Sequence, residues 1–111
     1  MSAYVVSIRL ATKNPDELSV YAQKAPASGA AAGRAMRRLA TSSGRIRALL
    51  GGVPEGVSIL EFATFEEAEA WFESPEYQEA VLHLTRGADY QMFIVEGQTE
   101  VFGAWPSTRA S

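Results

Sequence analysis

ATFEEAEAWFESPEYQEAVLHL, residues 63–84, consists mostly of helix-forming residues but has Pro75 near its middle. A proline inside a helix removes a backbone hydrogen bond, clashes with the preceding turn and costs about 3 kcal/mol. Ser74, just before it, is a preferred N-cap residue, and proline is well tolerated at the first helical position. The sequence therefore predicts that one helix ends and a second begins near Glu73 and Ser74.

Both predicted helices carry an apolar stripe. Thr64 and Glu67 have the spacing of a capping box, which predicts the start of the first helix. Helical periodicity then places one set of apolar residues on each helix: Phe65, Ala68, Trp71 and Phe72 on the first, and Tyr77, Ala80, Val81 and Leu84 on the second.

Alternating apolar residues predict strands before and after these helices. In residues 4–10, Tyr4, Val6, Ile8 and Leu10 face one way and Val5, Ser7 and Arg9 the other. The segments VSILEF (57–62) and DYQMFIVEG (89–97) are also predicted strands.

A further helix is predicted after the first strand. Asn14 has the features of an N-cap, Pro15 occupies the first helical position, and Glu17 is placed to complete a capping box. The apolar residues at helical spacing are Leu18, Tyr21, Ala22 and Ala25.

Residues 33–56 allow two interpretations. Propensity permits a helix over GRAMRRLA (33–40), whereas the turn-like TSSG and the alternation in RIRALLGG (45–52) favour two strands, the second one short. We adopt the two strands.

The order of elements predicts an α+β protein with a ferredoxin-like split β-α-β plan, in which helices cover one face of an antiparallel sheet. The other face would still carry Val5, Phe93 and Val95, or their counterparts of the opposite phase. Because that apolar face needs a second cover, we expect a homodimer.

Composition narrows the possible functions. The 111 residues include no cysteine, which excludes disulfides, thiolate metal sites and thiol nucleophiles. The net charge of -3 argues against general nucleic-acid binding. The N-terminal MSAYVVSIRLA lacks a signal-peptide pattern and no segment resembles a membrane span, so we expect a cytoplasmic protein with no membrane partner.

SILEFATFEEAEAWFESPEYQEA, together with the later FIVEG, resembles the bacterial family of the domain of unknown function DUF1330. The resemblance covers residues 3–97 and implies a ferredoxin-like fold and a back-to-back dimer that forms an α+β barrel. The family has no general assigned activity, but related barrels include cofactor-free oxygenases, cyclases and isomerases as well as non-catalytic proteins. Such analogy from fold carries little chemistry by itself.

The chain departs from the family pattern in two places. Members tend to have a Gly-Gly-Arg-aromatic strand that ends in Arg-Gly-Gly, where this chain has AGRAMRRLA. Arg38 matches the second arginine of that pattern. Leu84 stands where members often carry an arginine on the last helix. These departures imply a ligand unlike the typical one.

Three residues are candidates for catalysis. Glu61, inside a strand, has the position of a general base, or of a structural ion pair with Arg38 or Arg9. His83, the only histidine, is either an acid/base group or a hydrogen-bonded helix residue, and it lacks the partners for a metal site. Arg38 belongs to an arginine-rich segment that would hold an anionic ligand or pair with the acidic helices.

Four aromatic residues are candidates for ligand binding: Tyr77, Trp71, Phe72 and Tyr90. The sequence does not separate a role in the pocket wall from a role in the core.

We expect the domain, residues 1–97, to convert a small, largely apolar organic molecule without a cofactor or metal, by cyclisation, isomerisation or oxygenation. The alternative is a non-catalytic dimeric module that binds such a ligand. The arginine-rich segment contains no aromatic residues on which bases could stack, which argues against nucleic-acid binding through it. The extension, residues 98–111, contains Phe102 and Trp105, which we expect to dock on the protein.

Overall fold

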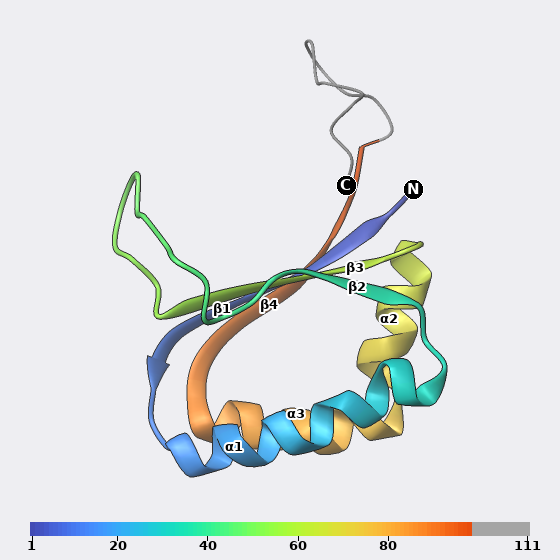
Figure 1. Cartoon of the computed structure of the whole chain (residues 1–111), viewed down its shortest axis with the longest axis horizontal. Helices are drawn as coiled ribbons and strands as arrows, with labels where there is room; N and C mark the ends of the chain where they lie inside the picture. The colour runs from blue at the N-terminus through green and yellow to red at the C-terminus, as the bar shows by residue number, and fades with distance from the viewer. Residues whose placement is uncertain (99–111) are drawn as a thin grey trace.

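The protein consists of a four-stranded antiparallel sheet with helices on one face (Figure 1). The structure is a computed structural model and describes residues 1–98. The strand order is β2-β3-β1-β4. The elements are β1 (Ala3–Thr12), α1 (Pro15–Lys24), two short 3-10 turns (Ala25–Ser28 and Ala30–Ala32), β2 (Met36–Ala40), β3 (Gly56–Phe62), α2 (Phe65–Glu73), α3 (Pro75–Gly87) and β4 (Ala88–Glu96). The ferredoxin-like α+β prediction is confirmed.

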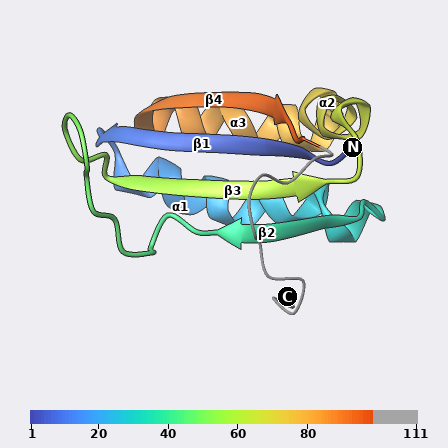
Figure 2. The ribbon, with the colours of Figure 1, turned by 90° about the horizontal axis from the view of Figure 1, so that it is seen from above.

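The topology places the two halves of the chain side by side in one sheet. β1 pairs with both β3 and β4, and β2 lies at the edge beside β3 (Figure 2). Each half crosses over the same face through its helices, so the sheet has one covered and one uncovered face in the single chain.

The predicted junction at Ser74 is present. The Ser74 hydroxyl accepts a hydrogen bond from the Tyr77 backbone N–H at 3.3 Å and donates one to the Trp71 carbonyl at 2.7 Å. Pro75 is the first residue of α3, where its missing N–H leaves no bond unmade. At the start of α2, the Thr64 hydroxyl accepts from the Glu67 N–H at 3.0 Å. Both predicted helix starts are confirmed.

The start of α1 differs in one respect from the prediction. The Asn14 side chain accepts from the Asp16 N–H at 3.1 Å, as an N-cap does. Glu17 does not complete a capping box, because the Asn14 N–H already donates to the Gly87 carbonyl at 2.9 Å. The Glu17 carboxylate instead contacts His83 on α3.

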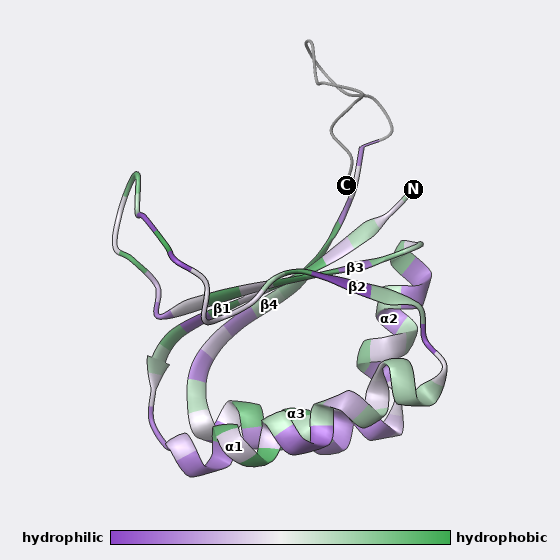
Figure 3. Cartoon of the chain, in the orientation of Figure 1, coloured by the Kyte–Doolittle hydropathy of each residue, from purple (hydrophilic) through white to green (hydrophobic). Residues whose placement is uncertain are grey.

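The prediction of a short strand over residues 45–52 is wrong. Residues 41–55 form a loop that projects beyond the sheet, and hydrophobic residues occupy its far end (Figure 3). Leu49 and Leu50 there are 82% and 95% exposed. Alternation alone does not make a strand, because a strand needs a hydrogen-bonding neighbour, and this segment pairs with no strand in residues 1–98. The strand predicted over 33–40 is present as β2.

The buried core lies at the end of the sheet that α2 covers. Its largest members are Val5, Phe62, Trp71 and Tyr77. The rings of Trp71 and Tyr77 are 4.0 Å apart between centroids, and Phe62 lies 5.4 Å from Trp71. Phe72, which the periodicity placed on the same helix face, is 37% exposed and lies at the edge of this cluster.

Strand register determines which residues face the helices. Val5 is buried beneath the helices and pairs with Leu60 and Ile94, so Val5 does not belong to the uncovered face. Phe93 and Val95 lie on the uncovered face, as one of the two predicted phases had it, but Val5 does not share their face, because its register partner on β4 is Ile94. The uncovered face carries the aromatic ring of Tyr4 and the apolar side chains of Val6, Ile8, Val57, Ile59, Phe93 and Val95.

Glu61 also lies on the uncovered face. Its carboxylate accepts a hydrogen bond from Arg37 Nε at 2.7 Å, across the β2–β3 register. The expected partners, Arg38 and Arg9, are therefore not the observed ones. The hydrogen bond from Arg37 holds the pKa of Glu61 below its ordinary value, against the opposing effect of burial.

Two predictions about the C-terminal extension cannot be compared with the structure. The docking of Phe102 and Trp105 and the extent of the C-terminal extension concern residues 99–111, which lie outside the described part. Within residues 1–98, no helix is long and apolar enough to cross a membrane.

Ser74→Ala should lower the free energy of unfolding by about 1 kcal/mol, because α3 loses its N-cap and the Trp71 carbonyl loses a donor. Chemical denaturation measures this, with Ser19→Ala on the exposed face of α1 as the control. A Ser74→Ala protein as stable as the wild type would contradict the cap.

Glu61→Gln should destabilise the protein by about 1 kcal/mol or less near neutral pH, because Arg37, whose side chain is largely solvated, loses a charged partner. A carboxyl group whose pKa is lowered by folding stabilises above its ordinary value of 4.5 and loses that effect as the pH falls through the folded pKa.

The difference in melting temperature between wild type and Glu61→Gln should therefore close as the pH falls below 4.5. Glu69→Gln, at an exposed position on α2, should show no comparable pH-dependent difference. A Glu61→Gln deficit that persists unchanged at low pH would refute the role of the ion pair.

Candidate functional site

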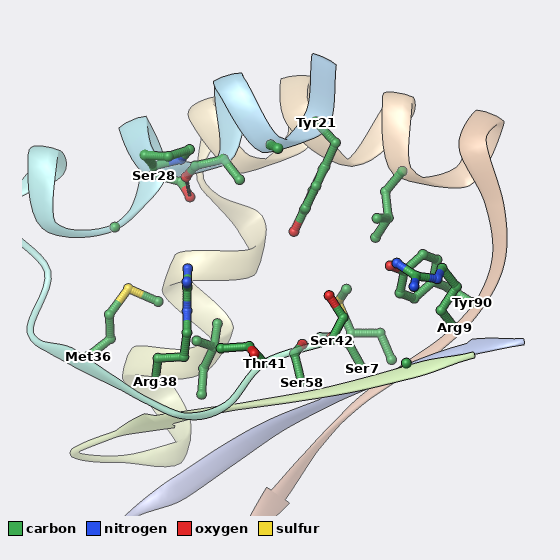
Figure 4. A pocket seen from close by; sticks show the side chains of 18 of the residues that line it. Ser7, Arg9, Tyr21, Ser28, Met36, Arg38, Thr41, Ser42, Ser58 and Tyr90 are labelled. Carbon is green, nitrogen blue, oxygen red and sulfur yellow. Dashed lines mark hydrogen bonds between the residues drawn. The ribbon is translucent and has the colours of Figure 1, made fainter. Parts of the chain in front are cut away.

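A cavity of about 850 Å³ lies between the sheet and α1 (Figure 4). Its volume falls within the range of about 300–1,000 Å³ that small-molecule sites occupy. Residues of β1, β3 and β4 form its floor, α1 and the 3-10 turns form its roof, and β2 forms one side. Trp71 closes the end nearest to the core.

The cavity exists because α1 does not rest on the sheet. The stripe that periodicity predicts on this helix, Leu18, Tyr21, Ala22 and Ala25, lines the cavity. None of the residues of α1 is fully buried. The helix packs against α3 instead, where a Cβ at Gly87 would lie 2.6 Å from the Leu18 side chain.

Two arginines line the cavity, and they differ in their partners. Arg9 Nε lies 3.2 Å from the Glu55 carboxylate, which also accepts a hydrogen bond from Thr12 at 2.7 Å. The Arg38 side chain extends from β2 into the cavity (Figure 4). Within residues 1–98, no carboxylate lies within 4 Å of the Arg38 guanidinium. Arg38 is thus a cation without an acidic partner among the described residues.

Hydroxyl groups supply the other polar surface. Ser7 and Ser58 are register partners on β1 and β3 and both line the floor. Tyr90 on β4 lines the cavity beside Arg9, and Thr41 and Ser42, which follow β2, line it as well (Figure 4). Serine and threonine hydroxyls can donate or accept a hydrogen bond, so this surface can bind ligand oxygens that are donors or acceptors.

Tyr21 carries a hydroxyl from the roof into the cavity (Figure 4). Its oxygen lies 2.8 Å from the Tyr77 hydroxyl, and the two rings meet edge to face. The Tyr77 hydroxyl is also 3.7 Å from Met92 Sδ. Burial raises the pKa of Tyr21, although the hydrogen bond with Tyr77 and the charge of Arg38 oppose it. Burial also raises the pKa of Tyr77, so both phenols stay protonated at neutral pH and each has one proton to donate.

The structure brings some of the sequence-predicted residues together and separates others. Arg38, Trp71 and Tyr90 line the cavity. Tyr77 is fully buried beside it and reaches it through Tyr21. The lining does not include Phe72, Glu61 or His83.

Glu61 and His83 have structural partners elsewhere. Glu61 pairs with Arg37 on the uncovered face of the sheet. His83 Nδ1 lies 2.5 Å from the Glu17 carboxylate and links α3 to α1 outside the cavity.

The sequence did not single out Tyr21, Ser7 or Ser58. Tyr21 has helical spacing that is typical of a core residue, and nothing in the pattern separates a core from a cavity lining. On β1, the face that begins with the buried Ala3 and Val5 continues with Ser7 and Arg9, and this change from apolar to polar residues is a sign of a polar site in the pattern.

The lining determines which chemistry the cavity can support. Among the described residues, it contains no aspartate, glutamate or histidine. No group of three or more potential metal ligands occurs in residues 1–98. A guanidinium and several hydroxyls surrounded by apolar side chains are suited to binding an oxygen that carries negative charge.

Solved structures with the same fold include proteins of unknown function and one oxygenase. A protein of unknown function from Rhodopseudomonas palustris is 14% identical, with a TM-score of 0.66 over 89% of this chain and 84% of its own. A dimeric ferredoxin-like protein of unknown function from Thermobifida fusca is 13% identical, with a TM-score of 0.57 over 86% of this chain and 91% of its own.

SnoaB, a cofactor-independent oxygenase from Streptomyces nogalater, is 11% identical, with a TM-score of 0.56 over 90% of this chain and 96% of its own. At these identities the likeness concerns the fold alone. No protein of curated function matches the chain. A family model, described as a domain of unknown function, matches residues 2–98, and the chain therefore belongs to the DUF1330 family.

Proposed function

We propose that the chain binds a small, largely apolar organic molecule in this cavity and converts it without a bound cofactor, by cyclisation, isomerisation or oxygenation. The observation that carries the proposal is the convergence of the Arg38 guanidinium and the Tyr21 hydroxyl on one cavity with apolar walls. A purely structural domain would fill this space with side chains.

The reaction classes share a requirement that the lining can meet. Cyclisation, isomerisation and oxygenation of carbonyl or phenolic compounds pass through species with negative charge on oxygen. Donors fixed around that oxygen lower the barrier more inside a protein than in water. Tyr21, held by Tyr77, and Arg38 are the groups in position to do so. The oxygenase SnoaB is a precedent for cofactor-free chemistry in this fold.

A non-catalytic binding module is the second candidate. One observation favours it: no aspartate, glutamate or histidine of residues 1–98 lines the cavity, so the usual proton acceptors are missing from the described wall. A binder needs shape, apolar contact and a few donors, and the same residues provide these.

We also propose that two copies associate through the uncovered face of the sheet. Phe93 and Val95 on this face are each 44% exposed in the single chain, next to Val6 and Ile59. An apolar face spread over three strands is costly to leave in water. The Thermobifida fusca relative is itself dimeric. The cavity lies on the other side of the sheet, so each copy keeps its own.

The functional test uses a small-molecule extract of bacterial cells incubated with purified protein, without added metal or cofactor, and untargeted mass spectrometry of the mixture. We expect wild-type protein to deplete at least one compound and to produce another. Ala22→Trp should abolish this conversion because the indole occupies the cavity from α1. Gln23→Trp, at the next residue on the same helix, should not, because Gln23 does not line the cavity.

Three outcomes are distinguishable in that experiment. Conversion by wild type and Gln23→Trp but not by Ala22→Trp supports the enzyme. Retention of a compound without conversion, lost in Ala22→Trp, supports the binding module. Neither conversion nor retention in the wild type refutes both functions. Thermal melts should show that both variants fold. We expect α1 to tolerate both substitutions because it contains no fully buried residue.

Phe93→Asp should convert the protein to a monomer, because it buries a charge in the proposed contact between copies. Multi-angle light scattering at micromolar concentration should give twice the chain mass for the wild type. Leu82→Asp, at an exposed position on α3, should remain dimeric. A wild type with the mass of one chain would contradict the proposed association.

A further inference from the structure

The charges of the cavity wall do not balance. The described lining contains two arginines and no acidic residue. Arg9 has a carboxylate partner in Glu55, so its charge is compensated at the rim. The Arg38 guanidinium has no ion-pair partner among residues 1–98. The residue Arg38 is exposed at the open side of the cavity, so water solvates its charge when no ligand is bound. The cavity of a single chain therefore carries one positive charge that no described carboxylate pairs with.

The neighbouring residue shows that this arrangement is not a general property of β2. Arg37 precedes Arg38, points to the opposite face and pairs with Glu61. The chain thus supplies a carboxylate for the arginine outside the cavity and none for the arginine inside it.

A second cation reinforces the positive end of the cavity. Arg34 donates to the backbone carbonyls of Ser28 and Ala70, at 3.2 and 3.5 Å. Ser28 itself lines the cavity. Arg34 has no carboxylate within 4 Å among the described residues. Arg34 does not line the cavity, but through Ser28 it adds positive charge next to the wall that Arg38 lines.

The rest of the wall limits what kind of anion fits. Leu18, Leu60, Leu84 and Met92 line the cavity and make it predominantly apolar. A phosphate group carries up to two charges and usually takes several backbone N–H donors or a helix N-terminus. A carboxylate carries one charge, and a single guanidinium binds it through two parallel hydrogen bonds.

Tyr21 supplies a second contact from the opposite wall. Its hydroxyl shares a hydrogen bond with Tyr77 at 2.8 Å, and Tyr77 is enclosed by core residues that fix its position. The single proton of the Tyr77 hydroxyl can go to Met92 Sδ, at 3.7 Å, or to the closer Tyr21 oxygen. When it goes to Tyr21, the proton of Tyr21 remains available to a ligand oxygen. A chain of two hydroxyls donates more strongly than one, because each bond polarises the next.

From these observations we infer that the ligand of the cavity is an organic monocarboxylate with an apolar ring system, bound through its carboxylate by Arg38 and Tyr21. This inference rests on the proposed function and names its substrate class. The apolar ring lies against the leucines and Met92, and the carboxylate lies toward β2. The carboxylate compensates the charge that Arg38 carries into the cavity.

Two probes that differ in charge test the inference: 2-naphthoate and 2-naphthamide, titrated calorimetrically at pH 7 and low salt. We expect wild-type protein to bind the carboxylate on the order of tenfold more tightly than the amide, the usual effect of a hydrogen-bonded charged group. Arg38→Met should remove that difference. Arg37→Met, the adjacent residue on the uncovered face, should preserve it.

Equal affinity for the two probes in the wild type would overturn the inference, as would a preference that survives in Arg38→Met. Absence of binding by either probe would also overturn it, because the cavity is large enough for the naphthalene ring. Equal binding that Ala22→Trp abolishes would refute the carboxylate while the proposed conversion of a neutral molecule stands. Failure of conversion with a carboxylate preference intact would instead favour the binding module.

Discussion

The contact between α1 and α3 at Gly87 is the constraint on which the site depends. The Gly87 carbonyl accepts hydrogen bonds from the backbone N–H groups of Lys13 and Asn14, at 2.8 and 2.9 Å. A side chain at Gly87 would collide with Leu18, so only glycine permits this approach. The start of α1 is thereby attached to the end of α3 and not to the sheet. The apolar stripe of α1 has no sheet residue to cover it, and the cavity is the result.

The junction at Ser74 determines where the cavity ends. It turns the chain between α2 and α3, so that Trp71 and Tyr77 come together over one end of the sheet. Side chains fill that end, and the opposite end stays open beneath α1. Tyr77 serves both parts: its ring belongs to the core, and its hydroxyl holds that of Tyr21. A substitution at Tyr77 would therefore alter stability and site together.

Local sequence chemistry predicted the elements well, because caps and alternation act over a few residues. Ser74, Thr64 and Asn14 begin helices as their spacing indicates. The predictions that failed concern contacts between residues far apart in the sequence. The alternation in residues 45–52 lacks a neighbouring strand to pair with, and Glu17 meets His83 because two helices pack together. For the same reason, the sequence placed Arg38, Trp71 and Tyr90 among the site candidates but could not separate them from Glu61 and His83, whose partners come from other elements.

The strand register determines which side chains point to each face of the sheet. A slip of one residue in strand register would exchange every inward side chain for an outward one. The pairing of Arg38 with Leu60, and of Arg37 with Glu61, fixes which arginine enters the cavity. The same register turns Val6 and Phe93 outward. An uncompensated arginine inside and an apolar surface outside are thus consequences of one arrangement, and covering the outer face with a second copy would also stabilise the register that presents Arg38 to a ligand.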